Sequence, residues 1–173
     1  MKITIKKSDI TKESVDAIVN AANSSLSGGG GVDGAIHKAA GPELIIECQK
    51  IISKIKKLNT GEAVITPAYN IKNVKYIIHT VGPIWQGGNF EEDKKLAKCY
   101  LNSAKIAAQN GLKSIAFPSI STGAYGYPVE KAAAVAVKTI MNLKENLDEI
   151  RMILFSDYDL GIYEREFKRY ENR

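Results

Sequence analysis

The apolar and polar positions of this chain follow two periods, one typical of strands and one typical of helices. Segments with the strand period alternate with segments with the helix period along the sequence. Short runs that alternate or are continuously apolar predict strands, and longer segments with apolar residues about every three to four positions predict helices. Strands are expected at residues 2–6, 16–21, 63–66, 75–81, 114–120 and 150–155. Helices are expected at residues 34–40, 42–55, 91–110, 128–147 and 160–170.

This order of elements predicts the α/β fold class, with a largely parallel sheet that is covered by helices on both faces. The 173 residues are expected to form a single domain, 1–173, large enough to bury a core. Ligands of such sheets bind beyond the carboxyl ends of the strands. Two glycine-containing loops and Phe155 should therefore lie at that end of the sheet.

The stretch from Asn20 to Gly34, NAANSSLSGGGGVDG, contains four consecutive glycines. Such glycines let the backbone approach a ligand closely, and successive N–H groups in a loop can hold an anion. Because the stretch has no Lys or Arg, a phosphate here would be bound by backbone dipoles and by the N-terminus of the helix that follows. The alternative is a flexible linker, which should be followed by a change in composition, and none is seen.

A second loop, residues 121–127 (STGAYGY), repeats this chemistry after another apolar strand. It has two aliphatic hydroxyl side chains, Ser121 and Thr122, and two glycines, contains no basic residue, and precedes a helix that starts at Pro128. Two such loops facing each other suit a diphosphate. Neither is a Walker loop or a dinucleotide fingerprint, because the Gly-Lys-Ser/Thr sequence and the acidic ribose partner are both missing.

The composition narrows the classes of function. Hydrophobic residues make up 45% and charged residues 25%, as in ordinary globular proteins, and no apolar run is long enough to cross a membrane. The first residues lack the apolar core of a signal peptide, so the chain is expected to be cytoplasmic. The net charge of +5 favours a nucleic-acid partner only weakly, because the basic residues are scattered.

Metal binding is not expected from the cysteines and histidines. Cys48 and Cys99 are far apart and form no zinc-like spacing with His37 and His79, so both are expected to be buried, inert thiols. His37 follows the glycines on the first turns of a helix, and it either lines the site or hydrogen-bonds to the backbone.

Serine hydrolysis is a competing interpretation, with Ser119 or Ser121 as the nucleophile and His79 as the base. Neither serine lies in a GxSxG elbow. His79 lies within a buried strand, where a hydrogen-bonded core histidine is favoured over a catalytic base.

Five segments, SDIT, VNAAN, GGGGVDGAIHKAAGP, HTVGP and PSISTGAYGYP, follow one another as they do in MacroD-like macrodomains, and the resemblance covers essentially the whole chain. It implies a three-layer α/β/α domain with a mixed, largely parallel central sheet that binds ADP-ribose. It also implies a hydrolase that removes ADP-ribose from mono-ADP-ribosylated Glu and Asp side chains and deacetylates O-acetyl-ADP-ribose. The expected partners are ADP-ribose, its esters and mono-ADP-ribosylated proteins; the protein is expected to be a monomer without cofactor.

The resemblance assigns roles to residues motif by motif. Asp9 accepts a hydrogen bond from the adenine amino group, with Ile10 beside it, and Phe155 stacks on the adenine ring. Asn23 and Asp33 are the pair associated with catalysis. The other expected ligand contacts are Asn20, Ala21, Gly30, Gly31, Val32, His37, Ser121, Thr122, Gly123, Ala124, Tyr125 and Gly126. Ser8 departs from the glycine that many relatives have, and neither the paired glutamates of poly(ADP-ribose) glycohydrolases nor the Cys/His pattern of zinc-containing macrodomains is present.

The residues themselves leave two mechanisms and two functions open. Asp33, beside a nest and a helix N-terminus, can stay ionised and orient or deprotonate a water near the distal ribose, while Asn23 can hold ribose hydroxyls. In the rival mechanism a substrate phosphate activates the water and Asp33 only shapes the ribose pocket. Both residues are also common in turns. A hydrolase is favoured over a reader that binds ADP-ribose without turnover, because a reader could dispense with both side chains.

Overall fold

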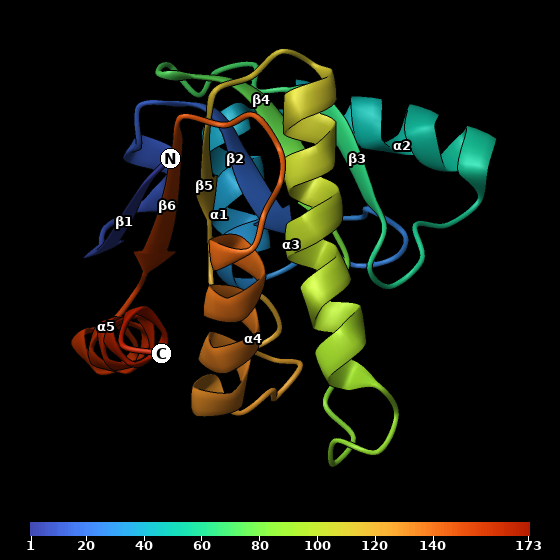
Figure 1. The fold of residues 1–173 in the computed structure, drawn as a ribbon. Coiled ribbons are helices and arrows are strands. Elements are labelled where there is room, and N and C mark those ends of the chain that lie inside the picture. The colour runs from blue at the N-terminus through green and yellow to red at the C-terminus, as the bar shows by residue number, and fades with distance from the viewer.

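A six-stranded mixed sheet forms the middle layer of the protein, whose computed structural model describes residues 1–173 (Figure 1). The strands are β1 (Lys2–Lys7), β2 (Val15–Ala21), β3 (Ala63–Pro67), β4 (Val74–Thr80), β5 (Ser114–Phe117) and β6 (Glu149–Leu154). Their order across the sheet is β1-β6-β5-β2-β4-β3. All neighbouring pairs are parallel except β3 and β4, which confirms the expected α/β class with a mixed, largely parallel sheet.

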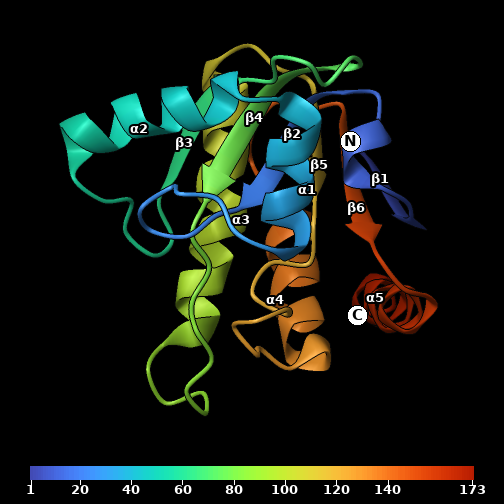
Figure 2. The same cartoon turned by 180° about the vertical axis from the view of Figure 1, so that it is seen from behind.

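Helices cover both faces of this sheet. One face carries α1 (Gly31–Ala40) and α2 (Glu43–Ile55), which lie in front in Figure 2. The other face carries α3 (Glu92–Gln109), α4 (Val129–Met141) and α5 (Asp157–Glu171). A short 3-10 helix, η1 (Ile10–Lys12), connects β1 to β2. None of the helices combines the length and the apolar character that a membrane crossing requires.

The alternation of side chains along the strands divides the apolar core into two clusters, one on each face. Ile78 of β4 packs in the cluster under α3, α4 and α5, whereas its neighbour Ile77 packs in the cluster under α1 and α2. The two thiols are buried, one in each cluster, as expected from the sequence. Burial raises the pKa of both Cys48 and Cys99 to about 11, so both are neutral at physiological pH.

Most predicted boundaries differ from the structure by one to three residues, and three of the differences bear on the site. α1 begins at Gly31 rather than Gly34, so that Asp33 lies in the first helical turn and not in the loop. β5 ends at Phe117 because the next residue is Pro118, which has no N–H to continue the ladder. β6 ends at Leu154, one residue earlier than predicted, and leaves Phe155 outside the sheet.

The predicted extension of α4 to residue 147 is wrong. The helix ends at Met141 and is capped by Asn142. Leu143 still packs against the core, and Leu147 is buried, but both do so from the connection to β6. The helical spacing of apolar residues continues past the end of the helix because this connection fills the same core.

The parallel strands bring four segments to one edge of the sheet. β2 lies between β4 and β5, with Asn20 opposite His79 and Ala21 opposite Thr80. Because β2, β4, β5 and β6 run in the same direction, the chain leaves all four at the same edge. The two glycine-containing loops, the segment after β4 and Phe155 therefore begin there, which is where ligands of such sheets bind.

Candidate ligand-binding and active site

Backbone N–H groups without partners line the end of the glycine loop, residues 22–30, and the first turn of α1. None of the N–H groups from Gly28 to Asp33 donates a hydrogen bond within the protein. A helix always begins with free N–H groups, and the glycines before α1 extend the row. Gly34 has no room for a side chain, because a Cβ there would stand 2.5 Å from the carbonyl oxygen of Gly29. A row of free donors of this kind suits an anion.

The Asn23 side chain folds the glycine loop onto itself. Its Nδ2 donates to the carbonyl oxygen of Gly28 at 2.9 Å. Its Oδ1 accepts from the backbone N–H of Ser27 at 3.0 Å and from the Ser25 hydroxyl at 3.1 Å. Asn23 therefore has the turn-forming role that the sequence left open for it. The second hydrogen of Nδ2 has no acceptor in the protein and can still be donated to a ligand.

Asp33 is the buried carboxylate of this region, with 7% of its surface exposed. Its Oδ1 accepts a hydrogen bond of 2.8 Å from Nδ2 of Asn20 and lies 3.4 Å from Nε2 of His37, one turn further along α1. Its Oδ2 makes no hydrogen bond within the protein and faces Gly29, where a Cβ would stand 3.4 Å away. The carboxylate is thus held through one oxygen, and the other is free for a water or a ligand.

The second loop, residues 121–126, supplies another row of free donors. None of the N–H groups from Ser121 to Tyr125 donates a hydrogen bond within the protein. The loop is anchored by the N–H of Tyr127, which donates to the Ser121 carbonyl at 2.9 Å, and by the N–H of Trp85, which donates to the Tyr125 carbonyl at 2.8 Å. Gly82 lets the segment after β4 pass beside it, because a Cβ at that position would overlap the Ser121 hydroxyl.

Asp9 and Phe155 lie beside each other at the ends of neighbouring strands. The N–H of Ser8 donates to the carbonyl of Leu154 at 3.1 Å, which ties the two chain segments together. Asp9 caps η1: its Oδ1 accepts from the N–H and the hydroxyl of Thr11 at 2.9 and 2.7 Å, and its Oδ2 makes no hydrogen bond within the protein. The Phe155 side chain is free to stack on a planar group, because the residue is 88% exposed.

The remaining predicted site residues lie along the same edge of the sheet. Ala21 is the last residue of β2, Val32 lies in the first turn of α1, and Ile10 is buried in η1. Thr122 turns its hydroxyl inward, to the Ser119 carbonyl at 3.1 Å and hydroxyl at 2.9 Å. Exposed positions among them are Gly30, Gly31, Gly123, Ala124 and Gly126.

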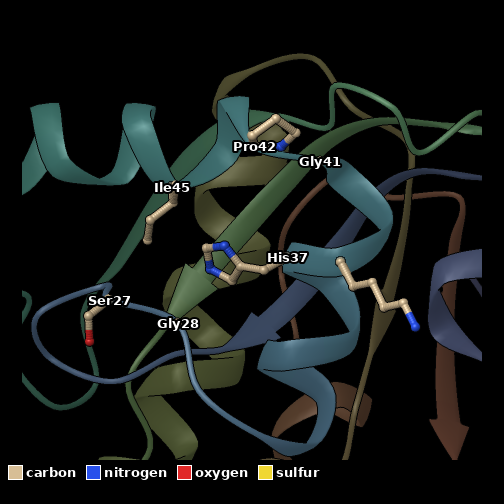
Figure 3. Close-up of a pocket in the computed structure, with 7 residues that line it drawn as sticks. Ser27, Gly28, His37, Gly41, Pro42 and Ile45 are labelled. Carbon is tan, nitrogen blue, oxygen red and sulfur yellow. The ribbon is translucent and has the colours of Figure 1, made fainter.

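His37, which contacts Asp33, also lines a depression of about 470 Å³ beside the glycine loop (Figure 3). The imidazole packs on Gly28, where a Cβ would stand 3.8 Å from the ring, and it makes no side-chain hydrogen bond to the backbone. His37 therefore lines the region around Asp33, which was one of its two predicted roles. The residues around the depression are Ser27, Gly28, His37, Lys38, Gly41, Pro42 and Ile45.

A serine–histidine pair is excluded by the contacts of His79. Its Nδ1 lies 3.1 Å from Nδ2 of Asn20 and its Nε2 lies 3.0 Å from the hydroxyl of Thr66, whereas the Ser119 hydroxyl bonds to the Tyr163 hydroxyl at 2.7 Å. His79 is completely buried, as expected of a core histidine. Thr66 was missed by the sequence analysis, since one hydroxyl in an apolar strand is a weak signal.

Known proteins resemble this chain along nearly its whole length. The sequence matches the Macro domain family over residues 19–136. It is similar to a macro domain-containing protein of Caldanaerobacter subterraneus, with 53% identity over 169 residues that cover 96% of each chain. It is similar to an O-acetyl-ADP-ribose deacetylase of Escherichia fergusonii, with 53% identity over 158 residues, 91% of this chain and 89% of that protein. Its structure is similar to that of a glycine-to-valine variant of the Oceanobacillus iheyensis macrodomain with ADP-ribose, with a TM-score of 0.94, 45% identity, and coverage of 98% of this chain and 93% of that chain.

Proposed function

This chain belongs to the macrodomain family, and on that premise we propose that it is an ADP-ribosyl ester hydrolase built as a single domain over residues 1–173. It binds ADP-ribose, removes it from mono-ADP-ribosylated Glu and Asp side chains, and deacetylates O-acetyl-ADP-ribose. The deacetylase of Escherichia fergusonii and the Oceanobacillus iheyensis macrodomain with ADP-ribose support this assignment. The structural observation that carries it is the buried Asp33 carboxylate, whose free Oδ2 faces the glycine loop and its row of unpaired N–H groups.

The two rows of free N–H groups are assigned to the diphosphate. Residues 28–33 and residues 121–125 each present consecutive donors, and neither stretch contains Lys or Arg. Each phosphate of ADP-ribose carries a negative charge, so two separate rows of dipoles suit a diphosphate better than one. Gly82 supports this assignment because it lets the segment after β4 lie against the second loop.

The adenine is assigned to the edge where β1 and β6 end. Oδ2 of Asp9 has no partner in the protein and can accept from the exocyclic amino group, while the exposed Phe155 ring stacks on the base. The distal ribose then lies at the other end of the diphosphate, beside Asn23 and Asp33. This order along the sheet edge follows from the strand order β6-β5-β2.

The hydrolysis uses Asp33 as the base. Oδ2 accepts a proton from a water while the water oxygen bonds to the carbonyl carbon of the ester. The bond between that carbon and the ribose oxygen then breaks, and the proton passes to the ribose oxygen. The products are a free carboxylic acid, acetate or the Glu or Asp side chain, and ADP-ribose. Asn23 maintains the shape of the glycine loop and donates its free Nδ2 hydrogen to a ribose oxygen.

The test separates the hydrolase from a reader that only binds. The protein is incubated with a glutamate-linked mono-ADP-ribosylated peptide and, separately, with O-acetyl-ADP-ribose, and released ADP-ribose is quantified. Calorimetry on the same preparation measures the affinity for free ADP-ribose. Turnover of both esters is expected. Binding of ADP-ribose without release from either ester would identify a reader and contradict the proposal.

A further inference from the structure

Four buried polar side chains form a hydrogen-bonded network that runs from the edge of the sheet to the candidate active site. Thr66 of β3, His79 of β4, Asn20 of β2 and Asp33 of α1 are 2%, 0%, 0% and 7% exposed. The Thr66 hydroxyl lies 3.0 Å from Nε2 of His79, Nδ1 of His79 lies 3.1 Å from Nδ2 of Asn20, and the same Nδ2 lies 2.8 Å from Oδ1 of Asp33. This Asp33 network connects three strands to one carboxylate.

The donor and the acceptor of each hydrogen bond in the Asp33 network can be assigned from the groups that can only donate or only accept. Nδ2 of Asn20 can only donate, so Nδ1 of His79 accepts from it and the neutral ring carries its proton on Nε2. The Thr66 hydroxyl then accepts from Nε2 of His79 and donates its own hydrogen to the carbonyl of Pro67, which lies 3.1 Å away. Nδ2 of Asn20 then donates one hydrogen to His79 and the other to Asp33. Burial, with His37 nearby, lowers the pKa of His79 to about 3, so the ring is neutral.

The orientation of the Asn20 amide depends on its two acceptors alone. Its Oδ1 is buried and has no hydrogen-bond partner in the protein, so nothing on that side of the amide opposes a flip. A flipped amide would present its oxygen to Oδ1 of Asp33. Two oxygens at that distance need a proton between them, so the flipped amide favours a protonated carboxyl group.

We propose that Thr66 and His79 are positioning residues that hold the Asn20 amide nitrogen toward Asp33 and thereby keep this carboxylate ionised and oriented. This inference rests on the proposed hydrolase function, because it assigns to the network the state of the proposed base. The Thr66 hydroxyl favours the His79 tautomer with the proton on Nε2. This tautomer favours the Asn20 orientation that places Nδ2 toward Asp33, and that donor favours the ionised carboxylate of Asp33. A neutral side chain on the edge strand thus controls a charge on α1.

Three other titratable groups lie around Asp33, and of these three only His79 contacts the Thr66 side chain. His37 on α1 contacts the carboxylate, His79 faces it from β4 through Asn20, and Cys48 on α2 is close enough to feel its charge. Burial, with Asp33 nearby, raises the pKa of the Cys48 thiol to about 11, so this group is neutral over the range to be tested. Differences between variants at Thr66 therefore report on the network.

The experiment compares Thr66→Val with Thr66→Ser and with a matched control, Thr80→Val. Thr80 is equally buried, and its hydroxyl donates to the Glu62 carbonyl at 2.8 Å without contacting the Asp33 network. For each protein, kcat and KM are measured against pH with O-acetyl-ADP-ribose, the ring ¹⁵N shifts of His79 are recorded, and thermal melting checks the fold.

In Thr66→Val we expect His79 to move to the Nδ1–H tautomer. The acid-side midpoint of the kcat profile should rise by about one pH unit, since loss of a hydrogen bond to a charged group is worth about tenfold in a protonation equilibrium. KM should change by less than about twofold. Thr66→Ser, which keeps the hydroxyl, should behave like the wild type, and Thr80→Val should lose stability without a shift of the profile.

An unchanged profile in Thr66→Val, or an equal shift in Thr80→Val, would overturn the proposal. So would an Nδ1–H tautomer of His79 in the wild type, which is measured without any variant. If the wild type releases no acetate, the proposed function fails. The tautomers of the wild type and of Thr66→Val then still decide whether the Asp33 network is arranged as inferred.

Discussion

Replacement of Asp33 by Asn tests the assigned base with little disturbance of the fold. In Asp33→Asn the amide oxygen can still accept from Nδ2 of Asn20, as Oδ1 does at 2.8 Å. The new NH₂ group takes the place of Oδ2, which makes no hydrogen bond within the protein and faces Gly29. Size and shape are kept, while the charge, the ability to take a proton and the free acceptor at Oδ2 are removed.

The expected effects on stability and on turnover differ widely. A charge-assisted hydrogen bond becomes a neutral one, which should change the free energy of unfolding by about 1 kcal/mol. Loss of a general base should lower turnover by about 10²–10⁴-fold, equivalent to about 2.7–5.4 kcal/mol in the activation free energy. Affinity for ADP-ribose should change by less than about tenfold, because the two rows of backbone donors remain.

Three measurements on each variant separate these effects: single-turnover release from a glutamate-linked substrate, calorimetry with ADP-ribose, and thermal melting. Asp93→Asn is the matched control, since Asp93 is exposed in the first turn of α3. Asn23→Ala should show a larger share of its defect in binding, because it releases the glycine loop from Gly28 and Ser27. Near-normal turnover of Asp33→Asn with normal binding would refute the base assignment and favour activation of the water by a substrate phosphate.

Four further results are expected. Phe155→Ala should weaken ADP-ribose binding by about 1–3 kcal/mol in calorimetry without lowering the melting temperature, since Phe155 is 88% exposed; unchanged affinity would mean that the adenine is misplaced. Release from an arginine-linked substrate should be far slower than from a glutamate ester, because the arginine linkage has no ester carbonyl carbon for the water to attack; comparable rates would contradict this. Burial raises the pKa of Glu92, but the backbone N–H groups within residues 86–90 outweigh it and lower the value from 4.5 to about 2. Glu92→Gln should therefore lower the melting temperature above pH 4.5, and the difference should shrink as pH falls toward 2; a constant difference would exclude this linkage. Burial lowers the pKa of His79 from 6.5 to about 3, so the unfolded chain binds its proton first and wild-type stability should fall as pH drops through that window; an equally steep fall in His79→Gln would assign it to other groups.

The fold was predictable wherever the apolar periodicity within one segment is enough to identify it as a strand or a helix. The period of the apolar residues distinguishes strands from helices, and the alternation of strands with helices along the chain implies parallel pairing of the strands. The antiparallel pairing of β3 with β4 is decided by contacts across the sheet, and only the resemblance to macrodomains indicated a mixed sheet. The end of α4 was misplaced for a related reason: Leu147 fills the core from a turn, and apolar spacing does not distinguish a turn from a helix there.

The candidate site was predictable to the extent that its chemistry belongs to the main chain. The rows of free N–H groups follow from glycine content and from the helix starts after the loops, although the sequence placed the start of α1 three residues too late. The side-chain contacts of the site were not predictable, because they join residues that are distant along the chain. Asn20 and His79 are 59 residues apart, and the partner of His79, Thr66, carries no signal of its own. That Asn23 shapes the loop also required the structure.

The assignment of the diphosphate to peptide N–H groups has a consequence for how this protein can change over evolutionary time. No single side chain provides the two rows, so replacing one side chain does not delete them, unless it forces the backbone aside at a crowded position such as Gly34 or Gly82. The proposed chemistry, in contrast, depends on one carboxylate. A descendant that loses Asp33 would keep the capture of its ligand and lose only the cleavage. A change of the single codon for Asp33 is therefore enough to convert the proposed enzyme into a binding protein.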